Sequence, residues 1–138
     1  MKESLITAIK EIRDNKSLST MDEASVISGI VERLLSLLGW NIHNIEEVKH
    51  EHSVGSKAVD FSLKIGGVTK GIIEAKRARE NLVSHQRQLL EYAFFEGVKL
   101  AILTNGIEWW FYLPLNEGNC QILLAEGAAH EQKTSIRG

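Results

Sequence analysis

Disulfide bonds, membrane spans and an export signal are all features that this sequence lacks. Its 138 residues include one cysteine, Cys120, which excludes an internal disulfide. No apolar run approaches the roughly 18 residues of a membrane span, and the first residues have no signal-peptide core. Together these absences predict a cytoplasmic protein that does not associate with membranes.

An excess of positive charge is also missing. The formal net charge is −2, with 16 Lys and Arg against 18 Asp and Glu. A protein that coats DNA through non-specific phosphate contacts is usually more basic. Basic side chains nevertheless gather at Lys76, Arg77, Arg79 and Arg87. The charge pattern therefore argues against a basic coat and permits a local basic surface, although solvated arginines are the default interpretation.

The composition and length predict an ordinary globular domain. Hydrophobic residues make up 43% of the chain and charged residues 25%. We assign residues 1–127 to one domain with one core. The chain from Glu126 onwards has little apolar content, and we expect residues 128–138 to form a flexible tail.

Hydrophobic periodicity predicts an α/β (α+β) fold with a central mixed β-sheet flanked by helices. Apolar stripes indicate helices, with Gly39 and Gly97 placed to end two of them. Alternation and turn signals indicate strands, and Asn105-Gly106 is the strongest hairpin turn signal. The expected helices cover residues 1–15, 22–38 and about 81–96, and the expected strands cover 47–54, 59–65, 68–76, 98–104, 107–113 and 119–125.

The hairpin expected over residues 59–76 carries charge where burial is costly. Asp60 lies within one strand, and Glu74 and Lys76 lie near the end of the other. Residues two apart in a strand share a face, so Glu74 and Lys76 point the same way. Two carboxylates can bind a divalent metal such as Mg²⁺, and a nearby amine can position the water that attacks a phosphodiester. This set predicts a metal-dependent phosphodiesterase site.

The register of this hairpin decides whether the two carboxylates can meet. A two-residue Gly66-Gly67 turn in unbroken register sets Asp60 opposite Ile73, so that Asp60 and Glu74 project from opposite faces. A three-residue loop, a bulge, or a bend at Asp60 would bring them together. The predicted site therefore requires one of these three irregularities.

Several short stretches then follow one another in a recognisable order between Met21 and Pro114. They are Glu23-Ala24, Leu38-Gly39-Trp40, Asp60, Glu74-Ala75-Lys76, Gln88-Leu89-Leu90-Glu91-Tyr92, Leu103-Thr104-Asn105-Gly106, Glu108-Trp109 and Tyr112. Asp60 with the Glu-Ala-Lys stretch resembles the PD-(D/E)XK nuclease signature, with Val59 where a proline often stands. The whole set resembles the N-terminal nuclease domain of type I restriction enzyme R subunits.

This resemblance implies a restriction-endonuclease-like core that cleaves DNA in a cytoplasmic restriction system. It implies that Asp60 and Glu74 bind Mg²⁺, with Mn²⁺ as a substitute, and that Lys76 assists the attacking water. Motor or methyltransferase subunits would act in trans, and the chain can belong to an oligomer. The ATP-binding motif GxxxxGK[ST] of the R-subunit motor does not occur in this sequence.

Other residues have a functional interpretation and a plainer one. Glu23 continues the apolar stripe of the second helix and can reach the metal site, or it can interact with the helix dipole. Glu32 is the rival carboxylate on the same helix. Gln88 and Tyr92 lie one helical turn apart. They support the site or contact DNA in one interpretation, and are a solvent-facing Gln and a half-buried Tyr in the other.

Two further clusters are more plainly structural. The alternating aromatics from Trp109 to Tyr112 are expected in the sheet core rather than in base stacking. His50 and His52 share one strand face by their spacing, without a second ligand pair nearby, and we interpret them as surface histidines. Cys120 is expected to be a small apolar filler.

Three other functions remain open from the sequence. The first is a structure-selective, Holliday-junction-resolvase-like nuclease with the same core. The second is a non-catalytic module on the same fold that binds nucleic acid or a partner. The third is an unrelated α/β binding domain, which would leave Asp60 and Glu74 apart.

Overall fold

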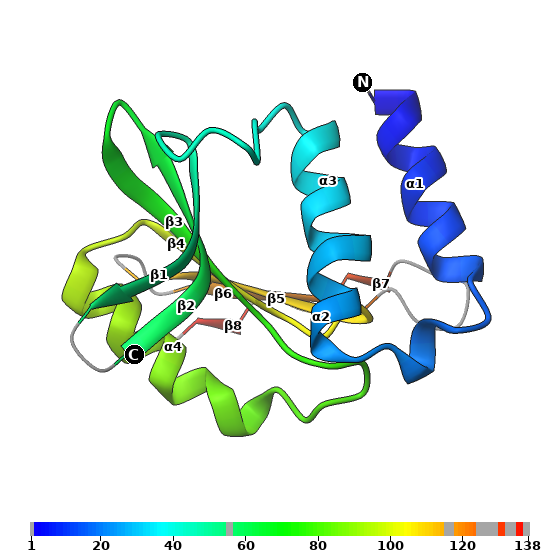
Figure 1. Cartoon of the computed structure of the whole chain (residues 1–138). Coiled ribbons are helices and arrows are strands. Elements are labelled where there is room, and N and C mark those ends of the chain that lie inside the picture. Colours follow the sequence, from blue (N-terminus) through cyan, green and yellow to red (C-terminus); the bar gives the residue numbers. More distant parts are fainter. Residues whose placement is uncertain (1, 55–56, 115–117, 124–129, 132–134, 137–138) are drawn as a thin grey trace.

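A twisted mixed β-sheet runs through the molecule and carries helices on both faces (Figure 1). The computed structural model describes residues 2–54, 57–114, 118–123, 130–131 and 135–136. The strands are β1 (Val48–Val54), β2 (Lys57–Ile65), β3 (Val68–Ala75), β4 (Leu100–Thr104), β5 (Glu108–Leu113), β6 (Gly118–Leu123), β7 (His130–Glu131) and β8 (Ser135–Ile136). The helical segments are α1 (Lys2–Asp14), η1 (Leu18–Thr20), α2 (Glu23–Val26), η2 (Ile27–Val31), α3 (Glu32–Leu37) and α4 (Val83–Glu96).

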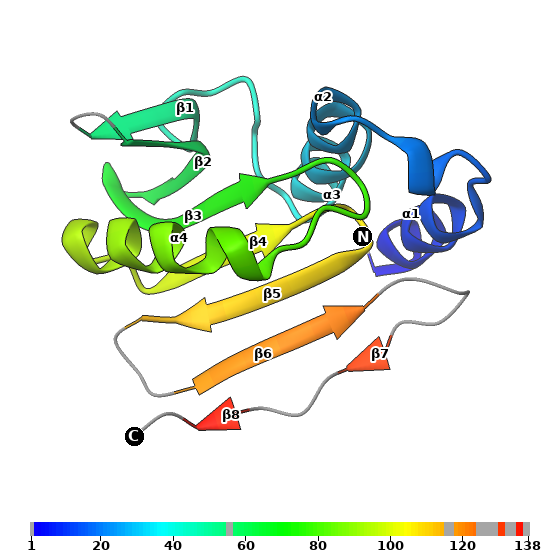
Figure 2. The ribbon, with the colours of Figure 1, turned by 90° about the horizontal axis from the view of Figure 1, so that it is seen from below.

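The strand order explains why the sheet is mixed. Strands β1 to β7 lie side by side in sequence order, and β8 also pairs with β6. Only β3 and β4, among the described strands, pair in parallel, because α4 connects them as a crossover helix. Figure 2 shows α4 lying across this part of the sheet. The predicted α+β class, with a mixed sheet flanked by helices, is confirmed.

Two cores form because the sheet buries both of its faces. On one face, α1 to α3 pack over Phe61, Ile73 and Trp109, with Val26 and Ile30 fully buried. On the other face, the helix α4 packs against the sheet through the following buried residues: Ile72, Leu82, Leu89, Ala93, Leu103, Trp110 and Tyr112. The aromatics of β5 thus alternate between the two cores, which confirms their predicted structural role.

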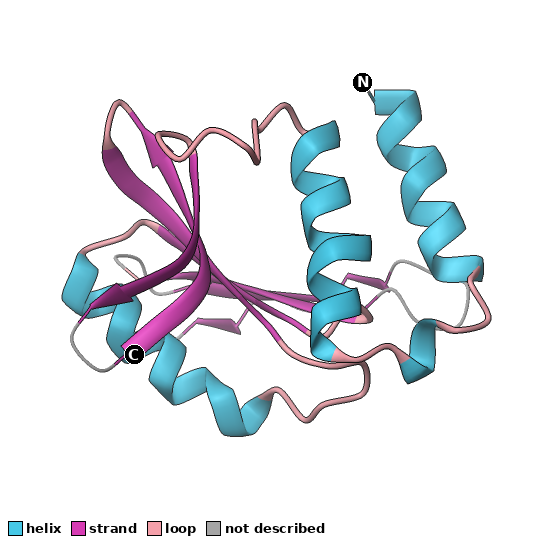
Figure 3. Cartoon of the chain, in the orientation of Figure 1, coloured by secondary structure: helices cyan, strands magenta, loops and turns pink. Residues whose placement is uncertain are grey.

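The second predicted helix contains a wider turn that periodicity did not indicate. Residues Glu23 to Leu37 form one continuous helix in Figure 3. Within it, Ile27–Val31 has π-helical hydrogen bonding. The Asp22 side chain accepts a hydrogen bond from the Ser25 backbone N–H (2.8 Å) and caps the helix start. A hydrogen bond from the Ser25 side chain and this backbone bond together lower the pKa of Asp22. At the other end, Trp40 N–H donates to the Leu35 carbonyl beyond the left-handed Gly39, as predicted for the stop.

The C-terminal segment is described only in part. Strand β6 confirms the strand expected over residues 119–125, within two residues at its ends. The two-residue strands β7 and β8 both pair with β6. The remainder of the predicted tail lies outside the described residues, as does the side chain of Cys120. In the described part of the chain, no helix is both long and apolar enough to cross a membrane.

We expect Gly106→Ala to destabilise the domain by about 2–4 kcal/mol. Gly106 has φ +87°, and a Cβ there would lie 2.9 Å from Ile30 Cδ1 in the core. Gly67 also has positive φ (+78°), but a Cβ there would meet nothing within 4 Å. Gly67→Ala is the matched control and should cost about 1–2 kcal/mol, the backbone contribution alone. Urea unfolding measures both, and equal losses would contradict the packing role of Gly106.

Candidate active site

A bulge in β3 sets the register that brings Asp60 and Glu74 together. Gly66 and Gly67 have φ of 60° and 78°, which is the geometry of a two-residue hairpin turn pairing Ile65 with Val68. The register then shifts, because Lys64 pairs with Thr69 whereas Leu63 pairs with Gly71. Lys70 is therefore the extra residue, and the shifted register continues to the Phe61–Ile73 pair. One step further along, Asp60 lies level with Glu74.

Asp60 also lies where the pairing of β2 with β1 is interrupted and the pairing of β2 with β3 ends. The pairing of β1 with β2 skips Glu51 and Asp60, and Glu51 has φ +53°. The residues flanking Asp60, Val59 and Phe61, belong to different cores, although residues two apart in a regular strand share a face. Strand β2 therefore bends at Asp60, and the structure shows both a bulge and a bend where either would have sufficed.

Side-chain hydrogen bonds replace the missing ladder bonds at this point. Ala75 N–H donates to Asp60 Oδ2 at 2.7 Å, and Asp60 N–H donates to Glu74 Oε1 at 3.2 Å. Each carboxylate thus satisfies a backbone donor of the other strand. The two side chains are held beside each other by the backbone, so they form one site, the acid pair.

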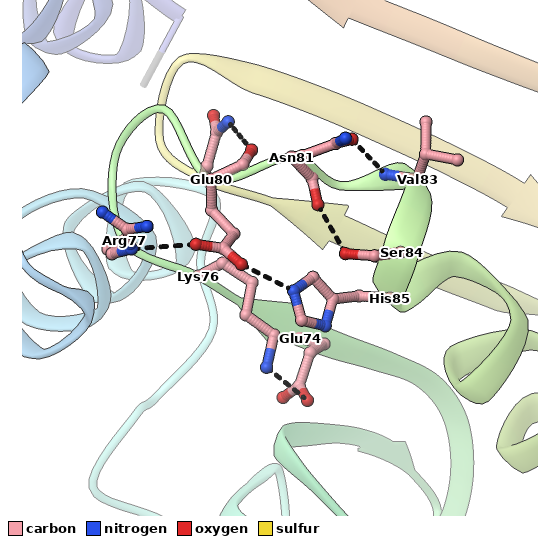
Figure 4. Close-up of polar contacts among 9 residues, drawn as sticks. Glu74, Lys76, Arg77, Glu80, Asn81, Val83, Ser84 and His85 are labelled. Carbon is pink, nitrogen blue, oxygen red and sulfur yellow. Dashed lines mark hydrogen bonds and ion pairs between the residues drawn. The ribbon is translucent and has the colours of Figure 1, made fainter.

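The acid pair is electrostatically strained without a bound cation. Burial, followed by the hydrogen bond and the negative charge of Asp60, raises the pKa of Glu74 from its usual 4.5 to about 8. Lys76 acts in the opposite direction, since its Nζ lies 3.7 Å from Glu74 Oε2. Figure 4 shows this contact. The raised pKa favours the protonated form of Glu74, which can donate a hydrogen bond to Asp60.

The acid pair fits a hard divalent cation. Carboxylate oxygens are the ligands that Mg²⁺ prefers, usually one or two of them with water and phosphate completing the shell. Within the described ranges, no group of three or more His, Cys, Asp and Glu side chains could hold a metal ion. Asp60 and Glu74 are thus the two protein ligands that this site could provide, and water and substrate oxygens would have to complete the shell.

Helix α4 closes the other side of the site. A small hollow, about 10 Å³ in volume and large enough for about one water molecule, is lined by Ala58, Val59, Glu74, His85, Gln88, Leu89 and Tyr92. Gln88 is exposed at its edge, whereas Tyr92 is 4% exposed and its hydroxyl donates to the His52 carbonyl (3.4 Å). Burial, with Glu96 nearby, raises the pKa of Tyr92 to about 12. This position suits support of β1 rather than direct DNA contact.

The predicted arrangement of His50 and His52 is wrong. The bend between them sends their side chains to different helices, although they are two residues apart. His50 Nε2 lies 3.2 Å from Glu32 of α3, and His52 Nε2 lies 3.4 Å from Glu96 of α4. The positive φ of Glu51 breaks the alternation on which the prediction depended.

The two helix carboxylates lie in different surroundings. Glu32 contacts His50, whereas Glu23 is exposed in the first turn of α2. Among the described contacts, neither makes a hydrogen bond or ion pair with Asp60 or Glu74. The role of Glu23 in the site therefore stays a prediction.

Of the three arginines predicted to bind DNA, two follow the C-terminal end of β3 and one lies on α4. Arg77 follows Lys76 and contacts Glu80, with its Nε 2.8 Å from Oε1. Arg79 is exposed and has φ +64°. Arg87 is 91% exposed and pairs with Glu91 at 3.1 Å. Their exposure is compatible with phosphate contacts, which remain a prediction.

His85 lies at this site although it was not among the predicted site residues. Its Nε2 lies 2.9 Å from Glu80 Oε2, and its ring lies between Glu80 and Glu74 in Figure 4. The available signal was its position on α4, three residues before Gln88, which places both side chains on one helical face.

Comparison with known families bears on the same region. Residues 53–119 match the model of the type I restriction enzyme R protein N terminus. The match covers just under half of the 138 residues. It contains the acid pair, Lys76, the stretch of α4 from Gln88 to Tyr92, and the β4–β5 hairpin. The comparisons with curated proteins and with solved structures gave no match. The segment from residue 53 to residue 119 is thus similar to the N-terminal region of type I restriction enzyme R proteins, which confirms the predicted resemblance.

Proposed function

We propose that the chain is a metal-dependent endonuclease domain that hydrolyses DNA phosphodiester bonds as a module of a restriction system. The observation that carries the proposal is the acid pair, in which Asp60 and a Glu74 of raised pKa lie beside Lys76. Structural ion-pair networks also shift pKa values, but two half-buried carboxylates beside an amine, with Glu74 lining a hollow, are typical of a catalytic site.

Each residue has a separate task in this proposal. Asp60 and Glu74 hold Mg²⁺, with Mn²⁺ as a substitute. When bound, the cation activates water and stabilises the charge that develops on the phosphate. Lys76 orients the attacking water and offsets the charge of Glu74. The water loses a proton as its oxygen bonds to phosphorus, the bond to the leaving sugar oxygen breaks, and that oxygen takes up a proton, so that one water molecule is consumed for each bond broken.

The surroundings of the acid pair have supporting tasks. Gln88, at the edge of the hollow, is placed to donate to a phosphate or to the water, and Tyr92 holds β1 against α4. Arg77, Arg79 and Arg87 contact DNA phosphates. Motor or methyltransferase subunits of a restriction complex would act in trans, and the protein would work in the cytoplasm.

The deciding experiment is nicking of supercoiled plasmid by the purified chain in Mg²⁺ or Mn²⁺, with EDTA as the blank. We expect divalent-dependent nicking of ordinary duplex DNA. Cleavage confined to a four-way junction would instead indicate a resolvase-like enzyme. Metal binding without cleavage of either the plasmid or the four-way junction would indicate a non-catalytic binding module.

Lys76→Ala should reduce nicking by about 10²–10⁴-fold, as expected for loss of a group that acts on the attacking water. Its binding of Ca²⁺ should persist, because both carboxylates remain. Lys99→Ala is the matched control, since Lys99 is an exposed lysine on the same domain, and it should nick like the unmodified chain. Equal nicking by both variants would remove Lys76 from the mechanism.

A further inference from the structure

Hydrogen bonds connect the segment between β3 and α4 to three different parts of the molecule. Lys76 N–H donates to the Thr104 carbonyl (2.8 Å) and Ala78 N–H to the Met21 carbonyl (2.9 Å). The Glu80 carbonyl accepts from Asn105 Nδ2 (3.0 Å). The residues held by these bonds alternate with the two exposed arginines of the segment, so this connection has a defined conformation although it lacks regular secondary structure.

Asn105 is a rigid anchor for Glu80. It is 1% exposed, and its Oδ1 accepts from the backbone N–H groups of Ile107 (2.9 Å) and Glu108 (2.7 Å). Its amide therefore has a fixed orientation, with Nδ2 directed at the Glu80 carbonyl. The β4–β5 turn thus positions the backbone of Glu80 relative to the sheet that carries Glu74.

The Glu80 carboxylate holds a basic side chain on each of its oxygens. Arg77 Nε contacts Oε1 at 2.8 Å, and His85 Nε2 contacts Oε2 at 2.9 Å. The guanidinium has four further N–H donors, and the Arg77 side chain is 69% exposed. His85 lines the same small hollow as Glu74. Figure 4 shows both contacts converging on Glu80.

We propose that Glu80 is a positioning residue that arranges Arg77 and His85 to bind DNA phosphates next to the acid pair. The inference rests on the proposed function, since it takes DNA as the ligand. A side chain that is already held in place loses less conformational entropy when it binds. The left-handed backbone of Arg79 is the kind of local strain found where a segment is held for binding.

Charge alone predicts the opposite effect of removing Glu80. An acid beside a phosphate-binding surface repels DNA, so losing it should tighten binding. If Glu80 positions its two partners, its loss should weaken binding instead. Glu80→Ala and Glu80→Gln remove the same charge, but the glutamine keeps an oxygen that can accept from Arg77. Positioning therefore predicts a graded loss, with the alanine variant weaker than the glutamine variant.

The test is the affinity for a labelled duplex in EDTA, measured by fluorescence anisotropy at several salt concentrations. We expect the Kd of Glu80→Ala to rise by about three- to tenfold, and that of Glu80→Gln to rise less. The salt slope of Arg77→Ala should fall by about one unit, as for one lost phosphate contact. Glu46→Gln is the control, because it removes an exposed acid that, among the described contacts, pairs with none of the arginines proposed to bind DNA; its Kd should stay the same or fall.

The outcomes separate the inference from the proposed function. Unchanged or tighter binding by both Glu80 variants, with thermal unfolding like that of the unmodified chain, overturns the positioning role. Failure of the unmodified chain to bind any duplex overturns the proposed DNA-directed function itself. Because the assay contains no divalent metal, its result does not depend on whether the acid pair cleaves DNA.

Discussion

Replacing Glu74 with Gln, or Asp60 with Asn, should lower metal-dependent DNA cleavage by at least about 10³-fold. Each change removes an anionic ligand while keeping the side-chain shape. A catalytic cation contributes several kcal/mol of transition-state stabilisation, and each 1.36 kcal/mol corresponds to a tenfold rate. Plasmid nicking in Mg²⁺ and in Mn²⁺ measures the loss, and calorimetry with Ca²⁺ measures metal affinity without turnover.

The same variants should fold as well as the unmodified chain or better. Glu74→Gln removes a buried charge that lies against Asp60, so its melting temperature without metal should rise by about 3–8 °C at pH 8. Glu46→Gln, at an exposed loop position, is the matched control for loss of one carboxylate. Full cleavage by both Asp60 and Glu74 variants would end the nuclease assignment.

The stability of the metal-free chain should fall as pH rises from about 4.5 to about 8. In this window the folded protein retains the Glu74 proton, because its folded pKa is about 8, whereas the unfolded chain has released it near 4.5. Below the window both states hold the proton, and above it neither does. The melting temperature of Glu74→Gln minus that of the unmodified chain should therefore grow from pH 5 to pH 9 and then level off.

Metal affinity should have the opposite dependence on pH. A cation must displace the Glu74 proton below about pH 8, so Ca²⁺ binding should strengthen as pH rises to that value and release a proton. Titration in two buffers of different ionisation enthalpy counts the released proton. A difference in melting temperature that is independent of pH, together with metal binding that releases no proton, would show that Glu74 is already ionised in the folded protein.

Several elements could be predicted because their signals are local. The turn at Gly66-Gly67 depends on two residues that tolerate positive φ, and the helix ends at Gly39 and Gly97 depend on one residue each. The buried strand β4 and the hairpin at Asn105-Gly106 follow from apolar content and turn chemistry within a few residues. The π-helical turn within the second helix has no such local signal, since its apolar stripe continues through it.

The sequence by itself determined which residues of the candidate site carry carboxylates and an amine, and that Asp60 can meet Glu74 only through an irregularity of the hairpin. Only the tertiary structure decided how they meet. The bulge at Lys70 depends on β3 pairing at the same time with β2 and, in parallel, with β4. The bend at Asp60 depends on Phe61 and Val59 packing beneath different helices. The place of Glu80 between Arg77 and His85 likewise required Asn105, 25 residues away, because long-range packing has no local signature.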